Sequence, residues 1–161
     1  MLNNNFTLFA LKAMENSSAT AINIHYLGSP TNTNWNGQIK NFFDTAFASM
    51  SQNAQGAWLM IGTDGTKVSK TDYALYAPVD EADLSFANSS VSSVTNLGDK
   101  KVYSVTITYN GAMPIEINEV GLRTNVMNTN GAYLRFLVAR EVITPIPVNN
   151  GDTFTVSMAI G

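Results

Sequence analysis

The strongest constraint on the fold is the strict alternation of apolar and polar side chains in the last third of the chain. Tyr103, Val105, Ile107 and Tyr109 alternate with Ser104, Thr106 and Thr108. Successive strand residues point to opposite faces of a sheet, so this pattern predicts a half-buried antiparallel strand. Three further strands are predicted over residues 115–122, 133–140 and 154–160, with turn signals at residues 110–111 and 128–131.

Glycine and proline refine this prediction. Gly121 lies inside a predicted strand and indicates a bulge or a close backbone approach. Pro145 and Pro147 have no N–H to donate to a ladder, so they place their segment at a sheet edge or outside the sheet.

The earlier part of the chain has weaker strand signals. We predict short strands at residues 6–11 and 21–26, which would pair as a hairpin, and a turn-rich link at residues 28–34. Residues 58–61 form a predicted strand that ends in a tight turn at residues 62–66. A further strand near residues 82–87 precedes a link rich in Ser and Asn at residues 88–96.

One amphipathic helix is predicted near residues 37–53. Its apolar residues follow helical spacing, with Asn36 as the N-cap and Gly56 beyond its end: Ile39, Phe42, Phe43, Ala46, Phe47 and Met50. This stripe either packs on the protein's own sheet or docks into a neighbouring protein. The candidate partner contacts are Phe42, Phe43, Phe47 and Trp35.

Many short strands, frequent turns and one helix predict a mainly β chain. The expected fold is an antiparallel β-sandwich, Ig-like or jelly-roll-like, with the helix near residues 37–53. We expect residues 1–56 to form an N-terminal attachment region and residues 57–161 to form the sandwich module.

Composition excludes several classes of partner. Charged residues are 13% of the 161 residues, against about 25% in typical globular proteins. Neutral amides and hydroxyls are cheaper to desolvate than charges, which suits contact with neighbouring subunits. The net charge of −3 argues against a nucleic-acid partner. The sequence has no cysteine, so neither a disulfide framework nor a thiolate metal site is available. It has no apolar run long enough to span a membrane and no signal-peptide pattern at its start, so neither a membrane nor export by the secretory route is expected.

No residue pattern typical of an enzyme is found. His25 is the single histidine and lies in a predicted strand, without a Gly-x-Ser-x-Gly motif elsewhere. Glycoside cleavage by a pair of carboxylates is not excluded by residue type, since the sequence contains Glu116, Glu119 and Glu141. Asp80, Glu81 and Asp83 form an acidic group that could bind a hard cation together with Asp64 or Asp72. Their spacing is not that of an EF-hand, so we interpret the group as a solvated acidic loop. We expect no cofactor and no catalytic residue.

Glu119 and Arg140 are flanked by apolar residues in strands that the turn near Asn130 would bring together. A buried carboxylate without a cationic partner costs several kcal/mol. We therefore expect Arg140 or Arg123 to form a structural ion pair with Glu119 and to fix the register of this hairpin.

Six segments within residues 57–161, in this order and spacing, resemble small structural proteins of tailed bacteriophage virions: Ile61-Gly62-Thr63-Asp64-Gly65-Thr66, Asp72-Tyr73-Ala74-Leu75, Glu119-Val120-Gly121-Leu122, Leu137-Val138-Ala139-Arg140, Pro145-Ile146-Pro147-Val148 and Gly151-Asp152-Thr153-Phe154-Thr155-Val156. The resemblance implies a β-sandwich module used in capsid auxiliary proteins, head-to-tail connector rings and tail-fibre attachment domains. Residues 1–56 carry no matching motif.

The resemblance implies a non-enzymatic virion protein, made in the bacterial host cytoplasm and present as many copies in a symmetric particle. The expected position is on the head, as an auxiliary (decoration) protein or connector subunit that contacts other virion proteins. A tail adaptor or fibre-anchoring protein is the near alternative. A carbohydrate-binding module and an unrecognised hydrolase also stay open, and the candidate sugar-binding aromatics are Trp35, Trp58, Tyr26, Tyr73, Tyr76 and Tyr133.

Overall fold

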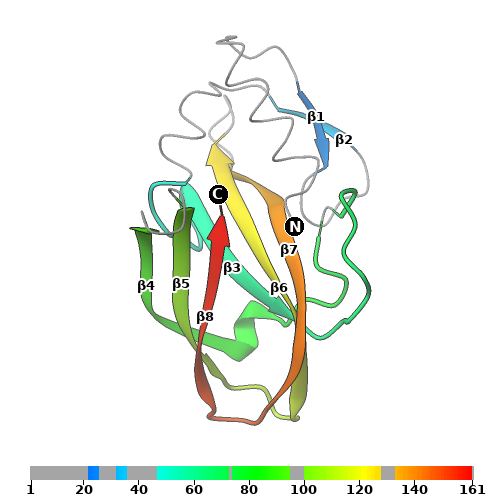
Figure 1. The fold of residues 1–161 in the computed structure, drawn as a ribbon, viewed down its shortest axis with the longest axis vertical. Helices are drawn as coiled ribbons and strands as arrows, with labels where there is room; N and C mark the ends of the chain where they lie inside the picture. Colours follow the sequence, from blue (N-terminus) through cyan, green and yellow to red (C-terminus); the bar gives the residue numbers. More distant parts are fainter. Residues whose placement is uncertain are drawn as a thin grey trace.

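The computed structural model describes residues 22–25, 32–35, 47–72, 74–94, 100–127 and 133–160, the first two ranges by their backbone alone. These residues are mainly β, and their helical structure is one three-residue 3-10 helix, η2 (Glu81–Asp83). The six longer strands form two sheets of three, and their arrangement can be followed in Figure 1.

The first sheet has the strand order β3-β6-β7, with all neighbours antiparallel. Its strands are β3 (Gly56–Gly62), β6 (Ile115–Met127) and β7 (Tyr133–Val148). The register of β6 against β7 shifts near Asn118 and again beside Val138. β7 is an edge strand and contains Pro145 and Pro147, in agreement with the edge position predicted for these prolines.

The second sheet has the order β4-β5-β8, also antiparallel throughout. Its strands are β4 (Leu84–Val94), β5 (Lys100–Tyr109) and β8 (Thr153–Ile160). The predicted alternation in β5 is confirmed, because Tyr103, Val105, Ile107 and Tyr109 are buried and the hydroxyl residues between them are not. Those hydroxyls pair across to β8, as in Ser104 with Ser157 at 2.7 Å.

Both sheets contribute to one hydrophobic cluster. Leu59, Leu122 and Phe136 of the first sheet join Val105 and Ile107 of the second, and all five are at most 1% exposed. The Trp58 and Phe86 rings meet edge to face, with centroids 5.1 Å apart, and link β3 to β4. Burial of these side chains, worth roughly 1.5–3 kcal/mol each, holds the sheets together.

The predicted helix is wrong over the part that the structure describes. Residues 47–53 form turns, bends and a bridge between Met50 and Ala57, and residues 37–46 lie outside the described residues. Phe47 is 5% exposed and packs edge to face with Tyr103, whose hydroxyl donates to the Phe47 carbonyl oxygen at 3.1 Å. The apolar residues of this segment therefore contact the core from a turn.

Two predicted links contain strands. β4 continues through residues 88–94, where a bulge with Asn88 at φ 49° interrupts its register against β5. At the N-terminal side, the backbone of β1 (Ile22–His25) confirms most of the strand predicted at residues 21–26. Its partner is β2 (Asn32–Trp35), which was expected to belong to a link. The strand predicted at residues 6–11 lies outside the described residues.

Candidate functional site: a buried polar row on strand β6

Alternate residues of β6 form a polar row on the sheet face away from the main core. Glu119, Gly121, Arg123 and Asn125 alternate with core residues such as Leu122, and all four are buried. Two irregular segments lie against this face: residues 51–54 accept hydrogen bonds from the row, and residues 76–77 donate to it, while Asp72 accepts one from Arg140 of the neighbouring strand β7. We call these four residues the β6 row.

Glu119 is fully buried and has three donors around its carboxylate. Arg140 Nε donates to Oε2 at 2.6 Å, and the backbone N–H of Ala77 donates to Oε1 at 3.0 Å. The N–H of Tyr76 makes a longer contact with Oε2, at 3.4 Å. The structure thus brings together the predicted pair Glu119 and Arg140, and it shows that Glu119 also anchors residues 76–77 to the sheet.

Asp72 extends this pair into a network. Arg140 Nη1 donates to Asp72 Oδ2 at 3.1 Å, and the exposed fraction of the Asp72 residue is 7%. The Ser69 N–H donates to the same oxygen at 2.9 Å, and the Tyr76 hydroxyl donates to Oδ1 at 3.1 Å. Two carboxylates therefore face one guanidinium, and each also accepts hydrogen bonds from residues 69–77.

The Tyr76 ring stacks on Arg140. The guanidinium carbon lies 4.5 Å from the ring centroid, a cation–π distance, while 56% of the Tyr76 surface stays exposed. The hydrogen bond to Asp72, and then the charge of that carboxylate, raise the pKa of Tyr76. Burial lowers the pKa of Arg140, but its hydrogen bonds and charge interactions with Glu119 and Asp72 outweigh burial, so the net shift is upward.

Two glycines make room for this network. Gly62 of β3 lies opposite Glu119, and a Cβ at Gly62 would overlap the Glu119 carboxylate. At Gly121 a Cβ would lie 2.8 Å from Leu75 Cδ2 and 3.0 Å from Leu137 Cδ1. The nearest atoms at Gly121 therefore belong to the side chains of Leu75, from the covering segment, and Leu137, and not to the backbone that was predicted to approach there.

Arg123 pairs with Glu81 rather than with Glu119. Its Nη1 lies 2.8 Å from Glu81 Oε1, and its Nη2 donates to the Gln52 carbonyl at 2.9 Å. The Gln52 side chain in turn donates to Glu81 Oε2 at 3.0 Å. Desolvation lowers the pKa of Arg123 against the opposing effect of the Glu81 charge. This pair ties residue 52 and η2 to the sheet.

Asn125 closes the row. Its Nδ2 lies within 3.1 Å of the carbonyl oxygens of Ser51, Gln52 and Ala54, which fixes the turn before β3. Residues 51–54 precede the predicted module, yet they are held to its central strand. Sequence analysis missed Asn125 and the contact of Asp72 with Arg140, because both contacts join residues about 70 positions apart. The available signal was the placement of Glu119, Arg123 and Asn125 at alternate positions of one strand, with Gly121 between the first two.

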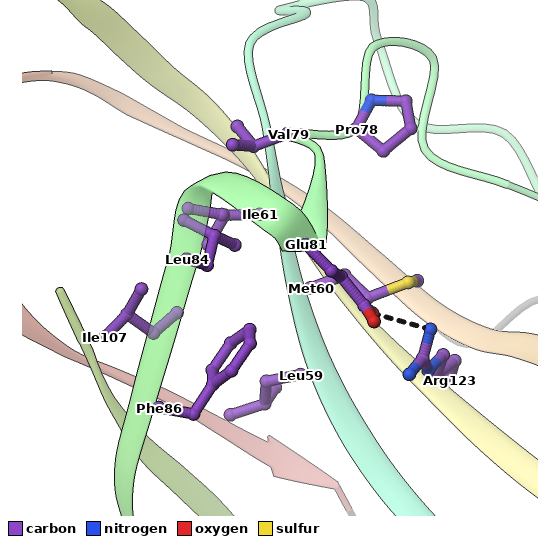
Figure 2. A pocket seen from close by; sticks show the side chains of 10 residues that line it. All are labelled: Leu59, Met60, Ile61, Pro78, Val79, Glu81, Leu84, Phe86, Ile107 and Arg123. Carbon is purple, nitrogen blue, oxygen red and sulfur yellow. Dashed lines mark ion pairs between the residues drawn. The ribbon is translucent and has the colours of Figure 1, made fainter. Parts of the chain in front are cut away.

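A pocket opens between β3 and β4 beside the Arg123–Glu81 pair (Figure 2). Its volume is about 100 Å³, and apolar side chains from β3, β4 and β5 form most of its wall, among them Leu59, Phe86 and Ile107. Figure 2 shows the ion pair at one side of these apolar residues. A hollow of this size accepts an apolar group the size of one side chain, and the Glu81 carboxylate in its wall is paired with Arg123.

The remaining predicted residues have different outcomes. Phe47 belongs to the protein's own core, so its assignment as a partner contact is wrong. Phe42, Phe43 and the side chain of Trp35 lie outside the described residues, as does the His25 side chain. Trp58 is 5% exposed and does not belong to an open sugar-binding patch, whereas Tyr76 is 56% exposed and has Arg140 over its ring. The side chains of Tyr26, Tyr73 and Tyr133 are not described.

The acidic loop is also used internally. Asp80 accepts a hydrogen bond from the Ala82 N–H and caps η2, and Glu81 binds Arg123. Within the described ranges, no group of three His, Cys, Asp or Glu residues has the arrangement of a metal site. Glu116 and Glu141 are exposed, whereas Glu119 is buried in its ion pair.

Comparisons with protein-family models, with curated proteins and with solved structures found no match. In the part of the chain that the structure describes, no helix has the length and apolar character needed to cross a membrane.

Proposed function

We propose that this chain is a non-enzymatic structural protein of a tailed bacteriophage virion, placed on the head as an auxiliary protein or connector subunit. The observation that carries the non-enzymatic part is the use of the buried charges. Asp72, Glu119, Arg123 and Arg140 are the buried charged residues among those described, and each belongs to an ion pair that holds a covering segment on the sheet. Such pairs rigidify a scaffold.

The fold proposed for this role is a β-sandwich. Two three-stranded antiparallel sheets share one hydrophobic cluster, and the ring contact of Trp58 with Phe86 joins them. Here the outer face of β4-β5-β8, several loops and sheet edges are open to contact, which suits binding to several neighbours at once. The segment order from residue 61 to residue 156, with its likeness to virion proteins, supports the phage context.

The outer face of β4-β5-β8 supports an assembly role. Its outward positions in β5 and β8 are mostly hydroxyls paired across the strands, as in Thr108 with Thr153 and Ser104 with Ser157. Paired hydroxyls already have hydrogen-bond partners, so a neighbouring protein covers them at a small desolvation cost. Contacts of this type, repeated over many copies, hold the subunits of a particle together without any chemical reaction.

Immunogold electron microscopy and mass spectrometry of purified tailed phage particles that encode this chain test the proposal. Label on the head or neck, with the chain present in many copies, is the expected result. Label at the tail or fibre base would replace the head position by the tail-adaptor alternative. Absence of the chain from purified particles would overturn the virion assignment, and specific binding on a glycan array would favour the carbohydrate-binding alternative.

A further inference from the structure

The two sheets have four edge strands, and these differ in how freely they can pair with another chain. At β3 the edge is covered, because the Ala57 N–H donates to the Ser49 carbonyl and the Val79 N–H donates to the Ile61 carbonyl. The β4 edge is broken by the bulge at Asn88. Bulges, prolines and charges are the devices by which proteins prevent an edge strand from pairing with another chain.

The β7 edge carries several such devices at once. It contains Pro145 and Pro147, the charged residues Arg135 and Glu141, and two shifts of register against β6. A regular ladder with another chain is blocked along most of this strand.

β8 has none of these devices. Its eight residues, TFTVSMAI, contain no charge and no proline, and its register against β5 runs without a shift from Thr153 to Ile160. Within the described chain, no backbone hydrogen bond outside the β5 pairing involves residues 153–160. Among the described residues, β8 is therefore an uncharged edge of regular register that has a partner on one side only, whereas the other three edges are obstructed.

We propose that β8 pairs antiparallel with β8 of a second copy of this chain, which joins two three-stranded sheets into one of six strands. This inference deepens the proposed function and rests on its premise that copies of the chain meet in an assembly. A two-fold axis perpendicular to the sheet makes the contact isologous, so each copy presents the same strand.

Side-chain and charge patterns favour a second copy as the occupant. Directly opposite residues of an antiparallel pair point to the same face, so the exposed positions Thr153, Thr155 and Ser157 meet hydroxyls or Ala159 of the partner. The inward residues Val156 and Met158 meet apolar residues and continue the core across the axis. Because β8 carries no charge, two copies meet there without repulsion, although each chain has a net charge of −3.

Analytical ultracentrifugation of the full chain over a range of concentrations tests this pairing. Wild-type protein is expected to form a reversible dimer, and Ser157→Lys is expected to weaken it at least about tenfold, since two lysines then lie along one short ladder. The matched control is Ser90→Lys, because Ser90 and Ser157 both lie opposite Ser104, on the two edges of the same sheet.

Ser157→Lys also removes the hydrogen bond to Ser104, so a second variant is needed. Ala159→Lys changes an exposed β8 residue opposite Val102, and it is expected to weaken the dimer as well. A wild-type chain that stays monomeric at every concentration, or a Ser90→Lys variant as defective as Ser157→Lys, would overturn the pairing. A dimer with this mutational pattern in a chain absent from virions would keep the pairing and overturn the virion assignment alone.

Discussion

Arg140 Nε lies 2.6 Å from Glu119 Oε2, between two strands whose register is irregular on both sides of this pair. The register of β6 against β7 shifts between Ile117 and Glu119 and again between Leu122 and Arg123. The ion pair thus marks the regular stretch between two irregularities. The Glu119 carboxylate also accepts hydrogen bonds from the backbone N–H groups of residues 76 and 77, so it connects two strands and a covering segment.

Replacement of Glu119 by Gln is expected to destabilise the fold by about 3–5 kcal/mol, because it leaves a buried guanidinium without its closest counter-charge. Urea denaturation followed by circular dichroism measures this change. The matched control is Glu116→Gln on the same strand, where the side chain is exposed and a change within about 0.5 kcal/mol is expected. Equal stability of the two variants would show that the Glu119 pair contributes nothing specific.

Substitution of Gly121 by Ala is expected to cost about 1–3 kcal/mol through overpacking. The added methyl would lie 2.8 Å from Leu75 Cδ2, which belongs to the covering segment, so local opening of residues 72–77 should increase. Thermal unfolding and amide hydrogen exchange of these residues measure both effects. Gly65→Ala serves as the control, because a Cβ there meets nothing within 4 Å. An unchanged melting temperature for Gly121→Ala would contradict the close packing described.

Asn125→Ala is expected to destabilise the turn before β3 by about 1–3 kcal/mol, since the carbonyls of Ser51, Gln52 and Ala54 lose their common donor. Limited proteolysis should then cut within residues 51–55 faster than in the wild-type protein. Asn53→Ala is the control, because the Asn53 side chain is exposed and its contact with Arg135 is 3.5 Å long. A similar cleavage rate in both variants would reject the anchoring role of Asn125.

Alkaline pH should destabilise the protein through Tyr103. Burial raises the pKa of Tyr103 from 10.0 to about 12, so the folded state retains a proton that the unfolded state loses first. The stabilising contribution is complete below about pH 10 and is lost as the pH rises to about 12, with a slope of up to about 1.4 kcal/mol per pH unit. Chemical denaturation at several pH values measures this slope.

Tyr103→Phe is expected to flatten the alkaline slope, while it lowers stability at neutral pH through loss of the hydrogen bond to Phe47. Tyr76→Phe is the comparison, because the pKa of Tyr76 is also raised but its side chain is largely exposed. If Tyr103→Phe kept the full wild-type slope, ionisation of Tyr103 would not be its cause.

Local periodicity explains why the strands of the last third could be predicted. The alternation from Tyr103 to Tyr109, and again from Phe154 to Ile160, fixes which side chains are buried whatever the partner strand is. The same reasoning failed for residues 47–53, because spacing that suits a helix is also satisfied when Phe47 enters the core from a turn. It failed again at residues 88–94, where pairing with β5 extends a strand through a segment rich in Ser and Asn.

The candidate site was accessible from sequence only in part. A charged residue within an apolar strand marked Glu119 and Arg140 as a pair, since burial demands a counter-charge. The same rule left Arg123 as an equal candidate, and nothing local indicates that Arg123 binds Glu81 instead. Asp72 and Asn125 look like ordinary loop and strand residues until the covering segments are placed on the sheet.

By itself, the sequence determined a mainly β chain, the inward and outward faces of its regular strands, and the need for a cation near Glu119. Tertiary structure decided which cation that is, which segments cover the β6 row, and which sheet edge has no second partner among the described residues. The physical reason is the range of the interactions. Alternation and charge burial act within a few residues, whereas the ion pairs, the turn anchored by Asn125 and the exposure of β8 depend on contacts between residues far apart in the chain.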